Sequence, residues 1–228
     1  MIRANAITLL LIVSCVSLVK GQLTNIQGLD NVVIRTKKYE DIKGSAYLYP
    51  IWNSGTLTDK NGKVYSNLLL KYDSYKDQVE LNQDGQIMEV GALNYPKFTL
   101  SFVESSTNKV NKHSFSTGYN VEGFNGISYF DLLFEGRITL LRKYKTTFIE
   151  DNVAGYGTSG TLKSFQSKTL YFVIDQNGVA RDIKPQKKSI LEVFPEQAPG
   201  IKVFLKDKKM KIKSEDDLID VIKFLNEN

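Results

Sequence analysis

The segment that decides the fold reads QVELNQDGQIMEV and covers residues 78–90. Two short runs, 78–81 and 86–90, that contain β-branched and other apolar residues lie on either side of the turn Asn82–Gly85. Such residues favour the pleated surface of a β-strand, and the Asp-Gly pair tolerates the positive φ of a tight hairpin turn. The segment therefore predicts two antiparallel strands joined by a short turn.

The same arrangement recurs along the chain. Turn sequences at Asp59–Gly62, Glu135–Gly136 and Asp175–Gly178 each separate two runs rich in β-branched and aromatic residues. Further strands are expected at 32–36 and 46–49. No helical pattern long enough for a parallel crossover lies between these strands, so we expect local antiparallel pairing.

Two segments interrupt this pattern. Residues 104–122 are polar and rich in turn formers, and we expect a long loop there. Residues 155–160 read GYGTSG, which fits the Gly-x-Gly-x-x-Gly string of dinucleotide-binding sites. That string binds a pyrophosphate only when a helix N-terminus follows it, and here a strand pattern follows. We therefore expect a flexible glycine loop and no nucleotide cofactor.

The C-terminal residues have a helical pattern. Residues 187–194 predict a short helix that ends at Pro195, and Pro199 suits the first turn of a second helix. Ser214, with Asp217 three residues later, predicts the capped start of a third helix. The apolar residues of this third helix recur at helical spacing at Leu218, Ile222 and Leu225.

Together these patterns predict an α+β fold that is mainly β. The expected body is an antiparallel β-meander or set of hairpins, built as a sheet, a half-barrel or a sandwich, with a short C-terminal helical element. The expected organisation is a signal peptide at 1–21, the antiparallel β body at 22–180, and the helical element at 181–228, packed on the body.

The first 21 residues resemble a secretory signal. An uncharged apolar run of 14 residues follows Arg3, and small residues precede a cleavage point after Gly21. A bilayer span needs about 20 apolar residues, so we expect no transmembrane span in the mature chain. The expected localisation is secreted or periplasmic. The alternative is an outer-membrane lipoprotein, because residues 12–15 fit a lipobox in which Cys15 is lipidated.

Charge and residue counts exclude several classes of function. The chain has 30 Lys+Arg against 25 Asp+Glu, a weak basic bias that does not indicate a nucleic-acid-binding protein. One His and one Cys supply too few ligands for the usual zinc sites. The Asp-rich turns lack the twelve-residue loop of an EF-hand. We therefore expect neither a metal nor a cofactor.

His113 is the only imidazole, so any histidine-based triad would have to use it. It lies in a polar stretch, and the chain contains no Gly-x-Ser-x-Gly elbow. We expect a surface histidine in a loop, no catalytic residue, and no effect of His113→Ala on fold or stability. Carboxylate-only chemistry stays open, because two acidic residues from distant parts of a chain can meet in the fold.

Two groups of residues are candidate ligand-binding surfaces. Tyr47, Tyr49 and Trp52 belong to the densest aromatic group, which suits a sugar or a peptide if exposed and core packing if buried. From residue 184 to 213, nine lysines stand against three acidic residues. This basic segment suits lipid phosphates or an acidic partner, with a solvated helix face as the alternative. The candidate binding residues within it are Lys208, Lys209, Lys211 and Lys213.

Several spaced motifs carry a resemblance to a known family. They are GSAYL at 44–48, LKYDSYKDQVE at 70–80, FEGR at 134–137 and LLRKY at 140–144. With these motifs the chain resembles a family of uncharacterised secreted proteins from the Bacteroidetes lineage, although Ala46 stands where the family usually carries Pro. That family has no assigned activity, so the resemblance implies an envelope location and a fold, and no functional residue.

We therefore expect an extracytoplasmic, non-enzymatic envelope protein that acts by binding or by structural support. Its expected partner is an envelope protein, a glycan or an anionic lipid surface, and not a nucleic acid. Two alternatives stay open. A carboxylate-dependent, glycosidase-like hydrolase needs two converging carboxylates, one with a raised pKa, whereas a carbohydrate-binding module needs a flat aromatic face.

Overall fold

The computed structural model describes residues 38–103, 109–155 and 158–228. The expected signal sequence, Cys15 and the strand expected at 32–36 lie outside these residues. Within the described ranges the chain forms ten strands and three helices.

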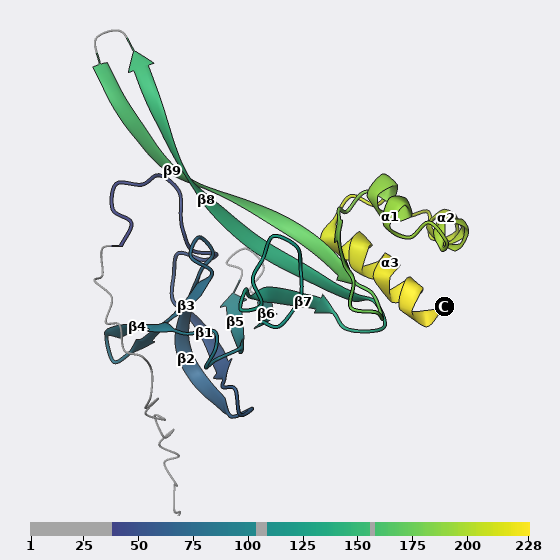
Figure 1. The fold of residues 1–228 in the computed structure, drawn as a ribbon, viewed down its shortest axis with the longest axis horizontal. Helices are drawn as coiled ribbons and strands as arrows, with labels where there is room; N and C mark the ends of the chain where they lie inside the picture. Colours follow the sequence, from purple (N-terminus) through teal and green to yellow (C-terminus); the bar gives the residue numbers. More distant parts are fainter. Residues whose placement is uncertain (1–37, 104–108, 156–157) are drawn as a thin grey trace, which may run out of the picture.

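One open antiparallel sheet organises the protein (Figure 1). Its strand order is β10-β9-β8-β7-β6-β5-β1-β2-β3-β4. The prediction of a mainly β, antiparallel fold with a C-terminal helical element is confirmed. The strands are β1 Asn53–Thr58, β2 Val64–Asp73, β3 Gln78–Gln83, β4 Gln86–Val90, β5 Lys97–Val103, β6 Val110–Ser116, β7 Phe130–Phe134, β8 Thr139–Gly155, β9 Thr158–Ile174 and β10 Ala180–Ile183.

The predicted turns join neighbouring strands. In the β1–β2 turn, Oδ1 of Asp59 accepts hydrogen bonds from the backbone N–H groups of Asn61 and Lys63. In the β9–β10 turn, Asp175 makes the same two bonds, to the residues two and four positions later. Gly62 and Gly178 then take a positive φ of 85° and 76°. Such Asx turns are local, which is why the sequence predicts them.

β8 and β9 form a hairpin that extends well beyond the rest of the sheet (Figure 1). Their ladder runs from the pair Thr139↔Ile174 to the pair Gly155↔Thr158, so the segment expected to be a flexible glycine loop belongs largely to two strands. Towards the base of this arm, the rings of Tyr39 and Tyr75 each lie 5.1 Å from the ring of Phe165. The arm is therefore supported by residues from distant parts of the sequence.

Two local predictions are wrong. The loop expected at 104–122 contains β6, which pairs with β5 along its whole length, because Phe115 and His113 are buried while their neighbours face outward. The strand expected at 46–49 is a bent segment with one isolated bridge, Tyr47↔Asp73. There Oγ of Ser45 accepts a hydrogen bond from the N–H of Tyr47, a local bond that competes with strand pairing.

The three helices are α1 Lys187–Val193, α2 Ala198–Asp207 and α3 Glu215–Glu227. Pro199 lies in the first turn of α2, and α3 begins with the predicted capping box of Ser214 and Asp217. All three helices pack at one end of the sheet, away from β1 to β4 (Figure 1). Their buried core joins Leu140, Val173 and Ile183 of the sheet to Ile190, Phe194, Ile201, Leu205, Leu218, Val221, Ile222 and Leu225.

Candidate functional site

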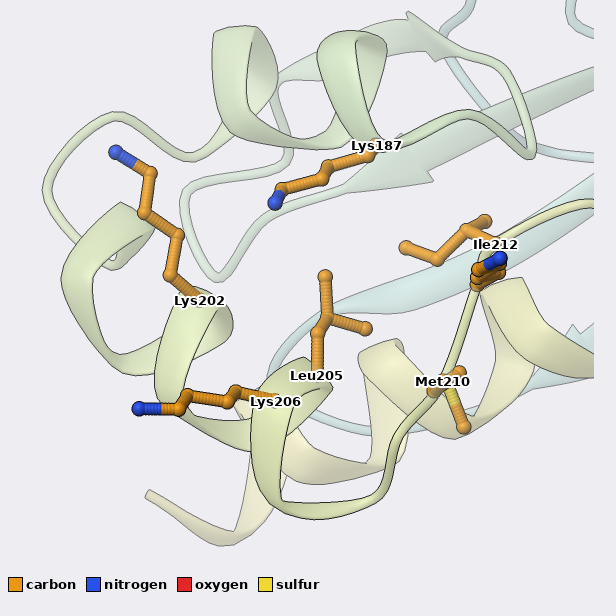
Figure 2. Close-up of a pocket in the computed structure, with 7 residues that line it drawn as sticks. Lys187, Lys202, Leu205, Lys206, Met210 and Ile212 are labelled. Atoms are coloured by element: carbon orange, nitrogen blue, oxygen red, sulfur yellow. The ribbon is translucent and has the colours of Figure 1, made fainter.

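Three cavities open around α2, and the most basic of them is the candidate functional site. It has a volume of about 360 Å³ and lies between the start of α1, the face of α2 and the link between α2 and α3. Figure 2 shows that the side chain of Lys187 extends across this space, whereas those of Lys202 and Lys206 extend outward from α2 at its rim. The residues that line this four-lysine cavity are Lys187, Lys202, Leu205, Lys206, Met210, Lys211 and Ile212.

A helix C-terminal motif shapes the four-lysine cavity. The backbone N–H groups of Lys209 and Met210 bond back to the carbonyls of Lys206 and Leu205, which reverses the chain after α2. Lys209 takes a φ of 50°, the left-handed conformation that glycine usually supplies in this motif. The chain then passes Met210 to Ile212, so that α2 and the link form two walls of the cavity (Figure 2).

The charged residues that line this cavity are all positive. Its four lysines are exposed, and in the described part of the chain none of them forms an ion pair with a carboxylate. By contrast, Lys38, which precedes β1, and Lys143 of β8 are bound to acidic partners. Leu205 at the base of the cavity is almost fully buried, and Met210 and Ile212 are partly buried. The cavity thus combines positive charge with an apolar floor.

The structure separates the four lysines that the sequence singled out. Lys211 lines the four-lysine cavity, whereas Lys208 lines a smaller hollow of about 280 Å³ beside Asp220 and Glu227. Lys209 and Lys213 are exposed and line neither cavity. The spacing of Lys202 and Lys206, one helical turn apart, is a signal that sequence reasoning missed. Lys187 reaches the site only through tertiary packing.

The aromatic candidates have partners within the fold. Lys71 lies over the rings of Tyr47 and Trp52, at 5.1 and 4.8 Å from their centroids. Tyr49 stacks on Phe102, with the two ring centroids 4.3 Å apart and nearly parallel. All three candidates are half-buried. The structure therefore does not bring Tyr47, Tyr49 and Trp52 together as one flat exposed surface.

His113 corrects another expectation, because it is buried in β6 rather than exposed in a loop. Its Nε2 lies 2.6 Å from the hydroxyl of Tyr49, and its Nδ1 lies 2.8 Å from Oδ2 of Asp131. Arg142 binds the same Oδ2 at 2.5 Å and reaches Glu215 of α3 at 2.6 Å. The network therefore ties β6, β7 and β8 to the last helix.

Tyr49, His113 and Asp131 place a hydroxyl, an imidazole and a carboxylate in the same order as a nucleophilic triad. The charges around these three groups, however, differ from those around a catalytic triad. A nucleophile needs a lowered pKa or a free base beside it. Burial raises the pKa of the Tyr49 hydroxyl, against the opposing effect of Arg142. Asp131 is shared between His113 and Arg142. This arrangement favours a structural role for the network.

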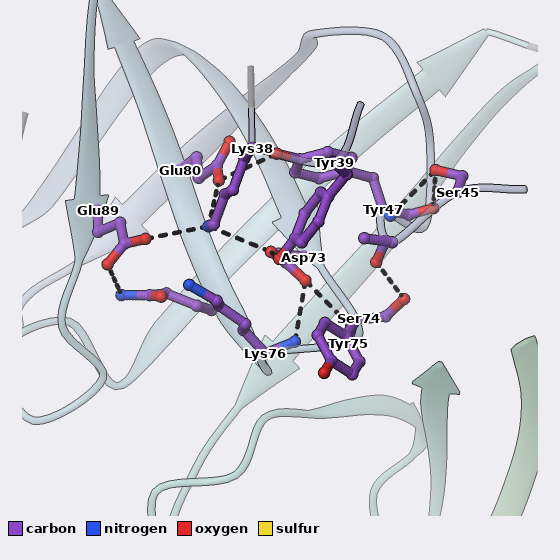
Figure 3. A network of polar contacts seen from close by, with 12 residues as sticks. Lys38, Tyr39, Ser45, Tyr47, Asp73, Ser74, Tyr75, Lys76, Glu80 and Glu89 are labelled. Carbon is purple, nitrogen blue, oxygen red and sulfur yellow. Dashed lines mark hydrogen bonds and ion pairs between the residues drawn. The ribbon is translucent and has the colours of Figure 1, made fainter. Parts of the chain in front are cut away.

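Three carboxylates converge on Lys38 near β2, β3 and β4 (Figure 3). The Lys38 ammonium lies 3.3 Å from Asp73, 2.9 Å from Glu80 and 3.0 Å from Glu89. A glycosidase acid needs a raised pKa. Burial acts in that direction on Glu89, but the hydrogen bond and charge of Lys38 outweigh it and lower the pKa. In the described residues, no group of three or more His, Cys, Asp and Glu side chains is arranged to hold a metal ion.

Among the described residues, no helix has the length and hydropathy that a transmembrane span requires. No protein-family model, curated protein or solved structure matches the chain.

Proposed function

We propose that this protein is an extracytoplasmic, non-enzymatic protein of the cell envelope that binds the headgroups of anionic lipids through the four-lysine cavity. One observation carries the proposal: four lysines without a carboxylate partner in the described chain line one cavity that has an apolar floor. The secretory pattern of residues 1–21 and the resemblance to secreted proteins support the envelope location.

The chemistry of the cavity favours a lipid phosphate. A lysine ammonium is a compact, strongly hydrated charge that binds phosphate without a fixed geometry. Each lysine near an anionic membrane surface contributes about 1 kcal/mol to binding. The four lysines together therefore supply about 4 kcal/mol to binding. The apolar side chains of Leu205, Met210 and Ile212 offer a surface against which the methylene groups next to a headgroup can pack.

Vesicle co-sedimentation tests the proposal. Full-length mature protein should bind vesicles that contain phosphatidylglycerol and not vesicles of phosphatidylcholine alone, and binding should weaken as salt is added. The double variant Lys202→Gln with Lys206→Gln should bind about 30-fold more weakly, because two lysines supply about 2 kcal/mol. The matched control is Lys97→Gln with Lys112→Gln, which removes two exposed charges from β5 and β6 and should bind as the wild type does.

The outcomes separate the alternatives. An equal loss in both double variants would show that only the overall charge matters, and would overturn the site. If the protein does not bind the anionic vesicles, the proposal that its ligand is a lipid headgroup is wrong. If inorganic phosphate binds at constant ionic strength while vesicles do not, the cavity takes a free phosphate and the membrane part of the proposal is wrong.

A further inference from the structure

A second and larger cavity lies on the side of α2 towards the end of α3. Its volume is about 770 Å³, within the range of small-ligand sites. It is enclosed by the β9–β10 turn, the link between α1 and α2, the first turn of α2 and the end of α3. None of its lining residues belongs to the four-lysine cavity.

The charges around this larger cavity nearly cancel. Arg137 and Arg181 face it together with Asp175, Glu192 and Glu196. Arg181 binds Asp175 at 2.9 Å, and Arg137 donates to the carbonyl of Leu225 at the end of α3. A polyanion or a polycation would meet repulsion from one of the two sets. The cavity therefore suits a ligand without net charge.

Amide side chains supply the polar contacts. Gln176, Asn177 and Gln197 line the cavity, and none of these three side chains has a hydrogen-bond partner in the described part of the chain. Each amide side chain can both donate and accept hydrogen bonds. Neighbouring hydroxyl groups of a ligand need both kinds of partner. Phe224 adds an aromatic wall, held in place because its ring stacks on Phe204 at 4.4 Å.

Gly200 leaves one wall of the cavity without a side chain. It lies in the first turn of α2 and lines the cavity. A Cβ at this position would meet only Cζ of Phe224, at an ordinary contact distance of 3.8 Å, so the fold has room for a side chain there. A glycine within a helix costs up to about 1 kcal/mol relative to alanine. Gly200 therefore leaves space beside Phe224 that a larger residue would occupy.

From these observations we infer that this cavity is a binding site for a neutral, polyhydroxylated ligand, a short oligosaccharide. Unpaired amides hold its hydroxyl groups, the ring of Phe224 packs against its C–H groups, and Gly200 leaves the space that a sugar ring occupies. The inference does not rest on the lipid-binding function, because the two cavities share no lining residue.

The test starts from a glycan array that carries neutral, N-acetylated and uronic-acid oligosaccharides. Full-length mature protein should bind neutral or N-acetylated glycans, and the best of them is then measured by titration calorimetry. Gly200→Leu places a side chain in this space, where its Cβ meets no backbone atom, and should weaken binding at least about tenfold, a loss of about 1.4 kcal/mol. Asn177→Ala should weaken it about fivefold, as expected for one neutral hydrogen bond.

Val203→Leu is the matched control, since Val203 is on the same helix, is exposed, and lines none of the three cavities. It should bind as the wild type does. The variant Lys202→Gln with Lys206→Gln should also keep full glycan affinity, and salt should have little effect. Failure to bind any neutral or N-acetylated glycan would overturn the inference, as would equal affinity of Gly200→Leu and Val203→Leu.

Discussion

Asp131→Asn provides the sharpest test of how α3 is held on the sheet. Asp131 is almost completely buried, and its carboxylate faces both His113 and Arg142. Burial by itself lowers the pKa of Arg142, but the charge of Asp131 raises it, so the guanidinium stays charged. Nε of Arg142 is buried without a hydrogen-bond partner in the described residues, which makes this side chain dependent on its two carboxylates.

The magnitude follows from the difference in exposure between these two carboxylates. The side chain of Asp131 is 2% exposed, and that of Glu215 is 25% exposed. Removing one partner of a buried ion pair costs about 3–5 kcal/mol, whereas a solvent-screened pair contributes about 1 kcal/mol or less. We expect Asp131→Asn to lower the free energy of unfolding by about 3 kcal/mol. The matched control Glu215→Gln should lower it by about 1 kcal/mol.

The assay is urea denaturation at neutral pH, followed by circular dichroism and by the fluorescence of Trp52, the only tryptophan. Most domains have 5–15 kcal/mol of stability, so both variants should remain folded. The double variant should lose less than the sum of the single losses, because both carboxylates act on the same arginine. Equal losses in the two single variants, or a larger loss for Glu215→Gln, would refute this account of the network.

Three further predictions concern separate parts of the fold. Lys209→Gly should raise the free energy of unfolding by about 1 kcal/mol in thermal or urea unfolding, because glycine takes the left-handed conformation without strain; a loss would contradict the described turn. His113→Ala should lower it by about 2 kcal/mol, because Asp131 and Tyr49 lose a buried partner, contrary to the expectation from sequence; an unchanged urea midpoint would refute the described burial. The pKa of Glu89 is lowered in the fold, so its stabilisation is present above about pH 4.3 and is lost as the pH falls through the lower, folded pKa. Lys38→Met should therefore destabilise the protein more at pH 7 than at pH 3, and an equal loss at both pH values would exclude the ion cluster as the cause.

The sequence predicts well those features that depend on neighbours along the chain. The turns at Asp59 and Asp175 form because each aspartate binds backbone N–H groups two and four residues later. The capping box of α3 spans only Ser214 to Asp217. Such bonds close within one turn, so the residues alone specify them.

Burial of polar residues depends on partners that are distant in the sequence. The segment around His113 has the composition of a loop, but β5 pairs with it and Asp131 from β7 satisfies its imidazole. A polar strand is stable only where partners from other strands bind its buried polar groups. Composition does not reveal those partners, so it predicted a loop.

The candidate sites show the same division. From the sequence alone, the protein is mainly β with antiparallel hairpins, has three C-terminal helices, and carries a surplus of lysines between residues 184 and 213. Only the tertiary structure decided which lysines line one cavity, because Lys187 of α1 joins Lys202 and Lys206 of α2 there through the folding of the chain. The larger cavity beside Gly200 likewise needs four separate segments, so no spacing in the sequence signals it. Local hydrogen bonds specify the elements, whereas long-range packing of side chains decides what those elements enclose.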